Sequence, residues 1–337
     1  MTHPAPHSPR SNGDAVLKVN DLAVLDYRTG EGVPLTGPIS FEIGTGEIFG
    51  LVGESGSGKS MTALALMRLV PHTSRVSGSA QLKQRDLISA SETAMRAIRG
   101  AELAMIFQEP MTALNPVFTL EAQLKAAIRA HRKVSSREAR TQSIELLRMV
   151  GIPDPETRLQ YYPHQLSGGM CQRVMIAMAL ASGAKFLIAD EPTTALDVTI
   201  QEQIVQLIER LVRESHLSVL FISHDLGVVA RLCDRVAVLY AGEIVEMGQS
   251  QILLRDPLHP YTKGLLRCAP DFSAVGVVRR GIPGTPPAAG KWDAGCRFRS
   301  RCEFAQEKCR APQMLEEFAP GHHVRCCRAQ ELRGKAS

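Results

Sequence analysis

The sequence predicts an α/β fold with a mixed-sheet core, an inserted helical subdomain and a small cysteine-rich extension at the C-terminal end. Strand-like apolar runs that end in glycines or polar residues alternate with helix-forming runs along most of the chain. A helical block at about 109–182 interrupts this alternation, and five of the eight cysteines lie in the last 42 residues. Because ligands bind at the carboxyl ends of buried parallel strands, functional residues are expected where the apolar runs end.

The composition suits one large globular domain with an appendage: 337 residues, 44% hydrophobic and 22% charged. No apolar run approaches the roughly 18 residues of a membrane span. Residues 1–14 are rich in Pro, Ser and His without a signal-peptide core, so we expect a disordered N-terminus and a cytoplasmic chain. The formal net charge is +5, and residues 279–337 carry 12 Lys and Arg against 6 Asp and Glu, which fits anionic lipid, nucleic acid, an acidic partner or a solvated surface.

A phosphate-binding loop is predicted at residues 53–60, which fit G-x-x-x-x-G-K-[ST]. An apolar strand at 48–52 leads into the loop and a helix at 61–69 follows, as this motif requires. The glycines let backbone N–H groups turn toward phosphate oxygens, and the helix N-terminus adds its positive end. Lys59 should reach the β- and γ-phosphates, and the Ser60 hydroxyl should bind Mg²⁺. The expected nucleotide contacts here are Gly53, Ser55, Gly56, Ser57, Gly58, Lys59, Ser60 and Met61.

Strand-like stretches at 14–25 and 39–43 precede this loop, and another follows at 76–80. Tyr27 comes directly after the first of them. An aromatic ring upstream of a phosphate loop can stack on a nucleotide base, or it can be the partly buried end of a strand. The position alone does not decide between these two roles.

The middle of the chain is mainly helical, with one strand at 105–107 that ends in Gln108. Serines at the expected helix starts are candidate N-caps. The helices expected here are 91–98, 120–132, 136–150 and 171–181.

Residues 166–170, Leu-Ser-Gly-Gly-Met, open the last of these helices and predict a second anion site. Ser167, Gly168 and Gly169 would leave unpaired N–H groups facing outward at the helix start. One nucleotide does not need two such sites in one chain, so this one is expected to serve a nucleotide held by another subunit. An ordinary glycine-rich helix start is the alternative.

Two continuous apolar runs, 186–191 and 219–225, predict buried parallel strands with polar residues at their exits. Asp190 suits a Mg²⁺ ion, through water, and Glu191 suits the polarisation of an attacking water. His224 leaves the second run and is a candidate contact of the γ-phosphate.

Together these motifs resemble those of an ATP-binding cassette (ABC) ATPase, a P-loop NTPase. In that resemblance 53–60 is the Walker A loop and 186–191 the Walker B strand, with Gln108 in the Q-loop and His224 as the switch histidine. The signature is 166–170, the D-loop is Ala195-Leu196-Asp197, and Tyr27 takes the place of the base-stacking aromatic. The resemblance covers about 15–270 and implies a nucleotide-binding domain at 15–258 that contains the helical subdomain.

The stretches 107–116, 162–165 and 259–266 resemble the dipeptide/oligopeptide importers, and the signature and Walker B together resemble their D-type subunit. This implies an F-type ABC ATPase as partner in a heterodimer, two membrane permease subunits and a solute-binding protein, with the chain on the cytoplasmic face of the inner membrane. One departure is Cys171, at a position that is usually arginine in this family.

The resemblance also implies the mechanism. Two cassettes would sandwich two ATP molecules, each between one Walker A loop and the partner's signature. Ser60, Gln108 and Asp190 would hold Mg²⁺, Glu191 would orient water, and His224 would sense the γ-phosphate. Gln108 would also couple the nucleotide state to the membrane partner.

Four C-terminal cysteines, spaced C-x5-C-x6-C-x16-C, could converge on a metal in an extension at 259–337. The spacing itself leaves an iron–sulfur cluster, zinc and free thiols open. Resemblance of 283–286 and 295–298 to the importers' C-terminal extension implies a 4Fe–4S cluster on Cys296, Cys302, Cys309 and Cys326, with Cys327 not a ligand.

Two other functions compete with peptide import. A soluble ABC-type ATPase acting on nucleic acid could use the basic tail, but no aromatic-interleaved basic stretch accompanies it. A regulatory redox module would not need the intact Glu191 and His224. The cargo stays open among dipeptides, oligopeptides, a nickel complex and other small solutes.

Overall fold

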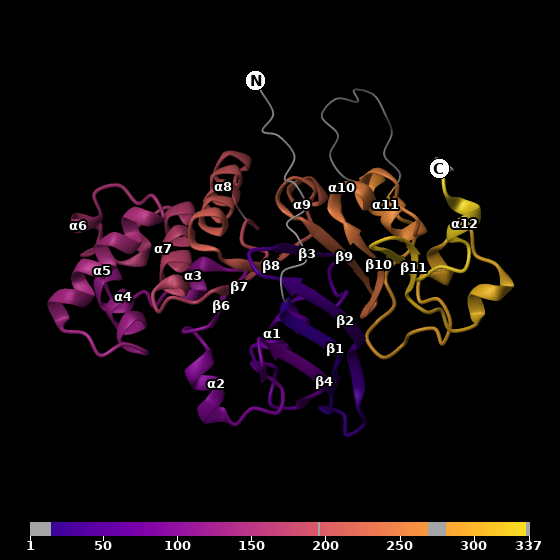
Figure 1. Ribbon diagram of the computed structural model, residues 1–337, viewed down its shortest axis with the longest axis horizontal. Coiled ribbons are helices and arrows are strands. Elements are labelled where there is room, and N and C mark those ends of the chain that lie inside the picture. Colours follow the sequence, from indigo (N-terminus) through magenta and orange to yellow (C-terminus); the bar gives the residue numbers. More distant parts are fainter. Residues whose placement is uncertain (1–14, 195, 269–280, 335–337) are drawn as a thin grey trace. The chain divides into compact units, whose positions relative to one another are not determined.

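The computed structural model of the chain describes residues 15–194, 196–268 and 281–334 (Figure 1). The chain divides into two compact units, one made of residues 1–89 and 221–337 and the other of residues 90–220. The expected disorder of residues 1–14 and the D-loop residue Ala195 lie outside the described residues.

The first unit begins with an antiparallel sheet in the order β2-β1-β4-β5 (Figure 1). Alternate residues of β1, such as Leu17 and Val19, are buried, because one face of the sheet packs inward and the other faces solvent. The predicted strands at 14–25, 39–43 and 76–80 are confirmed in this sheet. Their bounds are β1 Ala15–Asp26, β2 Val33–Gly44, β4 Ser74–Leu82 and β5 Arg85–Asp86.

A mixed sheet forms the core of the first unit, with the order β11-β12-β10-β9-β3. The pairing of β3 with β9 is parallel, whereas β9 with β10 and β10 with β12 are antiparallel. Every residue of β3 is buried, as its continuous apolar sequence predicts. The strands are β3 Ile48–Val52, β9 Arg235–Tyr240, β10 Glu243–Gln249, β11 Glu316–Ala319 and β12 His322–Val324; the helices are α1 Lys59–Leu66, α9 Leu226–Leu232, α10 Ser250–Arg255 and α11 Pro260–Cys268.

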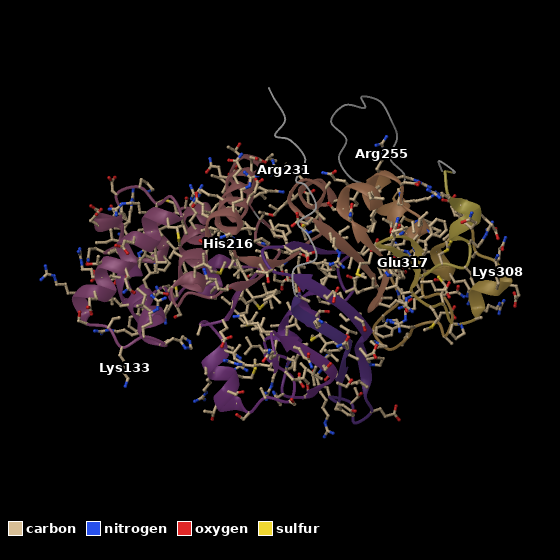
Figure 2. All side chains as sticks on the ribbon, viewed as in Figure 1. Lys133, His216, Arg231, Arg255, Lys308 and Glu317 are labelled. Atoms are coloured by element: carbon tan, nitrogen blue, oxygen red, sulfur yellow. The ribbon has the colours of Figure 1, made fainter. Side chains whose placement is uncertain are left out.

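Residues 281–334, here named the C-terminal segment, contain few regular elements. Its strand β12 extends the mixed sheet, and Val324 and Ala329 pack on Leu258 in a small apolar cluster. Surface ion pairs such as Lys308 to Glu331, 2.8 Å apart, lie on its outside, where Figure 2 shows Lys308 projecting from the ribbon. The other elements are the 3-10 turns η2 Arg299–Arg301 and η3 Glu307–Arg310, and the helix α12 Ala329–Leu332.

The second unit is mainly helical and contains the parallel pair β6–β7. Ser91 caps α2, as predicted, and of the two candidate caps of the next long helix, Ser135 and Ser136, it is Ser135 that caps α5 and forms a capping box with Glu138. The elements are α2 Glu92–Ile98, β6 Leu103–Ile106, α3 Pro110–Ala113, α4 Leu120–Arg129, α5 Ser136–Met149, α6 Pro155–Arg158, η1 Pro163–Gln165, α7 Gly168–Leu180, β7 Phe186–Asp190 and α8 Val198–Ser215. Strand β8 (Ser218–Ser223) crosses from this unit into the first.

No helix in the described ranges is long and apolar enough to cross a membrane. The 18-residue α8 has the required length, but its buried residues lie along one side, and charged residues occupy the other. Its apolar side packs on its own unit, where Gly169 of α7 lies against Ile200.

Candidate functional site

The loop between β3 and α1 in the first unit takes its shape from its glycines. A Cβ atom on Gly53 would lie 2.1 Å from the Leu239 carbonyl oxygen, so only glycine fits there. Gly58 precedes α1 with a φ of 105°, a conformation that other residues rarely adopt. The chain therefore turns sharply from β3 into the helix, and the N–H groups at the helix start are directed into the loop.

Lys59 is the first residue of α1 and is only 5% exposed. Its Nζ donates hydrogen bonds to the Gly53 and Glu54 carbonyl oxygens, at 2.8 and 3.1 Å. The buried Ser57 Oγ has no hydrogen-bond partner among the described residues. A buried cation and an unpaired hydroxyl in one loop are chemistry that suits a bound phosphate.

Tyr27 follows β1 in the first unit, with 39% of its surface exposed. The Arg75 guanidinium lies 5.1 Å from the centre of its ring. The Tyr27 backbone N–H donates to the carbonyl oxygen of Thr73 at 2.9 Å, which fixes the Tyr27 backbone to the residue that precedes β4. The ring is therefore held in a fixed place and partly open to solvent, while its stacking on a base stays a prediction.

In the second unit, the register of β6 and β7 brings their polar exits together. Ile106 pairs with Ala189, so Gln108 and the carboxylates after β7 leave the same edge. Gln108 Nε2 donates to Glu191 Oε2 at 3.0 Å, and Thr194 Oγ1 donates to the same oxygen at 2.9 Å.

Glu191 also has a φ of 46°, an uncommon value for a residue with a side chain. The backbone turn and the two donors hold its carboxylate in one orientation, as a residue that positions a water requires. Asp190, next to it, is 5% exposed. Thr194 was not predicted as a site residue, because its contact with Glu191 is visible only in the fold.

The start of α7 presents the serine and glycines that were predicted as an anion site. Ser167 is the N-cap and accepts the Met170 N–H at 3.3 Å, and Ser167 and Gly168 are exposed. Gly169 is buried against Ile200, and a Cβ atom there would lie only 2.5 Å from Ile200 Cγ2, so no larger residue fits without a shift. The helix begins at Gly168, three residues earlier than the predicted start at 171.

Cys171 does not take part in this exposed surface. It is fully buried, and its Sγ lies 3.5 Å from the Pro163 carbonyl oxygen. Burial raises the pKa of its thiol. The departure from the family's usual arginine therefore changes the interior of the unit and leaves the exposed helix start intact.

His224 directly follows β8 and is exposed. The next residue, Asp225, caps α9 by accepting the N–H groups of Gly227 and Val228 at 2.8 and 3.2 Å. This cap fixes the backbone that carries the histidine. The contact of His224 with a γ-phosphate stays a prediction.

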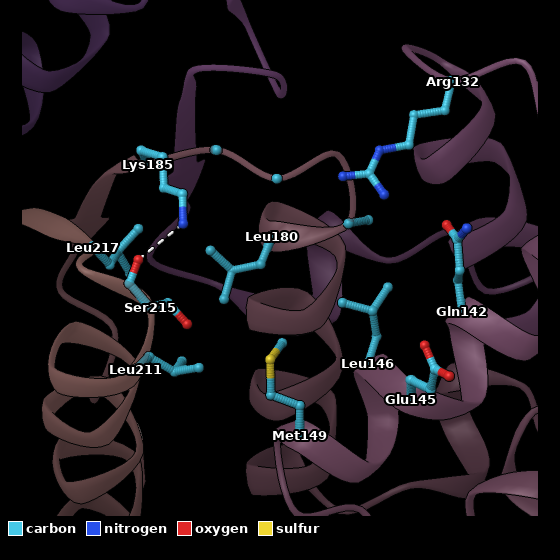
Figure 3. A pocket seen from close by; sticks show the side chains of 13 residues that line it. Arg132, Gln142, Glu145, Leu146, Met149, Leu180, Lys185, Leu211, Ser215 and Leu217 are labelled. Atoms are coloured by element: carbon cyan, nitrogen blue, oxygen red, sulfur yellow. Dashed lines mark hydrogen bonds between the residues drawn. The ribbon is translucent and has the colours of Figure 1, made fainter.

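A cavity of about 440 Å³ in the second unit is lined by residues outside the sequence motifs (Figure 3). Leu180, Leu146 and Met149 line it, and Lys185 Nζ donates to the Ser215 carbonyl oxygen at 2.9 Å on its side. Lys185 precedes β7 whereas Asp190 ends it, and five strand residues span roughly 16 Å. The cavity therefore lies at the opposite end of the strand from the carboxylates.

The predicted ligand cysteines all line one small cavity in the first unit, here named the four-cysteine site: Cys296, Cys302, Cys309 and Cys326. His259, 1% exposed, lines the same cavity. Its Nδ1 accepts the Tyr261 backbone N–H at 3.1 Å, and burial lowers the pKa of the ring to about 3. The neutral ring therefore carries its proton on Nε2, which has no partner among the described residues.

Burial raises the pKa of the Cys296 thiol to about 12 and that of Cys302 to about 11. Within the described ranges, no three His, Cys, Asp or Glu side chains are placed closely enough to hold a metal ion. Cys327 is exposed, with its Sγ 3.8 Å from that of Cys309. A metal bound to Cys296 and Cys302 would therefore have to displace the protons of their thiols.

Comparison with known proteins shows the family. The family described as "ABC transporter" matches residues 36–194, and "Oligopeptide/dipeptide transporter, C-terminal region" matches residues 245–309. A "Probable peptide ABC transporter ATP-binding protein" of Sinorhizobium fredii is 47% identical over 95% of this chain and 96% of its own length. The chain belongs to the ABC transporter ATPases of the oligopeptide and dipeptide group.

Other members of this ABC family are similarly close. The dipeptide transport ATP-binding protein DppD of Haemophilus influenzae is 47% identical over 93% of this chain and 95% of its own. The oligopeptide transport ATP-binding protein OppD of Escherichia coli is 44% identical over 94% of both chains. Peptide or dipeptide transport, and not nucleic acid, is what these descriptions name.

The cassette fold of this ABC ATPase is shared with solved structures. The ATP-binding cassette MJ0796, solved as a dimer bound to ADP and Pi after hydrolysis, matches 70% of this chain and 99% of its own, with a TM-score of 0.63 and 26% identity. The expected mixed-sheet cassette is therefore confirmed. Sequence reasoning missed Glu54, Tyr261 and Arg301, whose contacts join parts of the ABC ATPase that are far apart in sequence and leave no local signal.

Proposed function

We propose that the chain is the ATP-hydrolysing subunit of an ABC importer for peptides or a related small solute. The observation that supports this most is the phosphate loop with its buried Lys59, in a chain that matches peptide-transport ATP-binding proteins over nearly their whole length. We assign the nucleotide-binding domain to 15–258, with a helical subdomain at about 109–182, and the importer-type extension to 259–337.

We assign the nucleotide contacts to the phosphate loop, with Tyr27 as the base-stacking ring. Mg²⁺ would be held by Ser60, Gln108 and Asp190, and Lys59 would neutralise phosphate charge. Glu191, oriented by its two donors, would position the attacking water. His224 would contact the γ-phosphate, and Gln108 would report the state of the site to the membrane subunits.

A second ATPase subunit would complete the site. The exposed Ser167 and Gly168 suit the γ-phosphate of a nucleotide held by the partner, which we propose is an F-type ABC ATPase. Two permease subunits would place the chain at the cytoplasmic face of the inner membrane, with a solute-binding protein on the other side. ATP would drive transport by binding the closed pair of ATPases more tightly than the open pair.

We further propose a 4Fe–4S cluster at the four-cysteine site, with zinc as the alternative. What supports this proposal is that four thiols and the unpaired Nε2 of His259 line one small cavity; the thiols would have to move closer together to ligate a cluster. The cluster would cross-link a segment that has few regular elements of its own. His259 would donate its Nε2 proton to a cluster or thiolate sulfur.

Reconstitution with the permeases and the F-type partner in vesicles tests the transport proposal. Peptide and its binding protein should stimulate Mg-ATP hydrolysis, and Lys59→Ala should abolish ATP binding and stimulation together. ATPase activity that responds to DNA in a salt-dependent manner, and not to peptide, would overturn the proposal in favour of a nucleic-acid function.

A further inference from the structure

Glu54, the second residue of the phosphate loop, is held by two later parts of the first unit. Its backbone N–H donates to the Tyr261 hydroxyl oxygen at 2.8 Å. Its carboxylate accepts two hydrogen bonds from the Arg301 guanidinium, 2.6 Å from Nη1 to Oε2 and 3.1 Å from Nη2 to Oε1. A bidentate pair of this kind fixes both the position and the orientation of the carboxylate.

Arg301, which fixes Glu54, is itself fixed by its surroundings. The side chain is 4% exposed, and its Nε donates to the Pro283 carbonyl oxygen at 2.8 Å. Its guanidinium lies 5.7 and 5.9 Å from the ring centres of Tyr240 and Phe298. All three guanidinium nitrogens of Arg301 therefore donate to fixed acceptors, and the C-terminal segment holds the guanidinium rigidly against the loop.

The contact leads directly to the nucleotide-binding lysine on one side and to the four-cysteine site on the other. The Glu54 carbonyl oxygen accepts one of the hydrogen bonds from Lys59 Nζ, so Arg301, Glu54 and Lys59 form one chain of contacts. Arg301 immediately precedes Cys302, which lines the four-cysteine site.

We propose that Arg301 is a positioning residue for ATP binding, through which the C-terminal segment holds the phosphate loop in its binding shape. The inference rests on the proposed nucleotide function of that loop. Lys59 must leave the loop carbonyls to reach a phosphate, and the loop keeps its shape during that exchange because Glu54 is clamped from outside. Since coupling between two sites is reciprocal, ATP should also stabilise the four-cysteine site.

Arg299 provides a matched control on the same 3-10 turn. It also binds a carboxylate through its guanidinium, with 2.7 Å from its Nε to Asp293 Oδ2, but both partners lie in the C-terminal segment. Arg299→Met therefore removes an arginine–carboxylate pair from the segment without touching the phosphate loop.

The test measures the Kd for ATP of the full chain by calorimetry, with turnover measured separately in the assembled transporter. Arg301→Met should raise the Kd about tenfold or more, since tenfold corresponds to about 1.4 kcal/mol of lost preorganisation. The turnover at saturating ATP should change much less, which separates a loss of binding from a general loss of structure. Arg299→Met should keep the wild-type Kd.

Glu54→Met approaches the same contact from the loop side, in case Arg301→Met unfolds the segment. It should raise the Kd similarly, and the double variant should be no worse than either single variant, because both remove one contact. A wild-type Kd in Arg301→Met and Glu54→Met would overturn the inference. If the wild-type chain itself failed to bind ATP, the proposed function would fail instead.

Discussion

The phosphate loop and the C-terminal segment belong to the same compact unit but are stabilised in different ways. The loop joins a buried strand to a helix, and Lys59 bonds to carbonyls five and six residues away. The C-terminal segment has short elements and depends on contacts with distant residues, such as Arg301 with Glu54, 247 residues apart. A binding site built from a local motif can thus depend, for its precise shape, on a segment that has no motif of its own.

The junction of the C-terminal segment with the mixed sheet depends on a buried carboxylate. Glu246 of β10 is 0% exposed and accepts the N–H groups of Leu258 and His259, at 2.7 and 3.0 Å. His322 Nε2 of β12 lies 2.8 Å from the same carboxylate. Glu246 therefore ties the start of α11 and the C-terminal segment to the mixed sheet.

The largest expected effect lies in the local motif. Glu191→Gln should leave the Kd for ATP nearly unchanged and lower turnover about 10²–10³-fold, the usual cost of losing one preorganised transition-state contact. Single-turnover hydrolysis in the assembled transporter measures it, with Glu202→Gln on α8 as a control. Turnover within a few-fold of wild type would show that Glu191 does not position the water.

The junction should be the next most sensitive point. Glu246→Ala leaves several buried donors without an acceptor and should lower the free energy of unfolding by about 3 kcal/mol. Urea denaturation, followed through the single tryptophan, Trp292, in the C-terminal segment, measures the loss. The exposed Glu317 (Figure 2) accepts the Gly321 N–H at 2.8 Å at the surface, so Glu317→Ala should cost less than about 0.5 kcal/mol. Equal losses in the two variants would show that Glu246 does not hold the C-terminal segment on the mixed sheet.

Changes at the four-cysteine site should affect the C-terminal segment and leave the phosphate loop largely unchanged. Cys302→Ser should remove the bound metal and make the C-terminal segment more susceptible to proteolysis, whereas Cys327→Ser, outside the cavity, should keep both. Anaerobic iron, sulfide and zinc analysis gives the content, with about four irons per chain expected from a cubane cluster. Stoichiometric zinc without iron would favour a structural zinc site, and wild-type metal content in Cys302→Ser would exclude that cysteine as a ligand.

The smallest effect concerns the histidine at the cavity. His259→Phe removes one N–H donor and should lower the reduction potential of the cluster by roughly 40 mV, the equivalent of a hydrogen bond of about 1 kcal/mol in a one-electron couple. Spectroscopic redox titration measures the shift. His323→Phe on β12, which does not line the cavity, should keep the wild-type potential. If His259→Phe kept the wild-type reduction potential, as His323→Phe should, His259 would make no hydrogen bond to the cluster.

Much of the cassette could be predicted because its strands and its phosphate loop follow from short stretches of sequence. The loop at 53–60 is recognisable because only glycine fits at Gly53 and Gly58, whereas the start of α7 was predicted three residues too late, because the Ser167 cap is visible only in the fold. The continuous apolar runs identified β3, β7 and β8 as buried strands, since both faces of these strands are covered.

Other features were decided only by the tertiary structure. The clustering of the cysteines near the C-terminus was visible in the sequence, but their shared cavity and the orientation of His259 come from the packing of α11 against the C-terminal segment. The clamp on Glu54 has no pattern at all, because it joins residues 247 positions apart whose neighbours give no hint of each other. Backbone geometry constrains which residues a short motif can use, whereas a long-range polar pair needs only that the folded chain bring two side chains together.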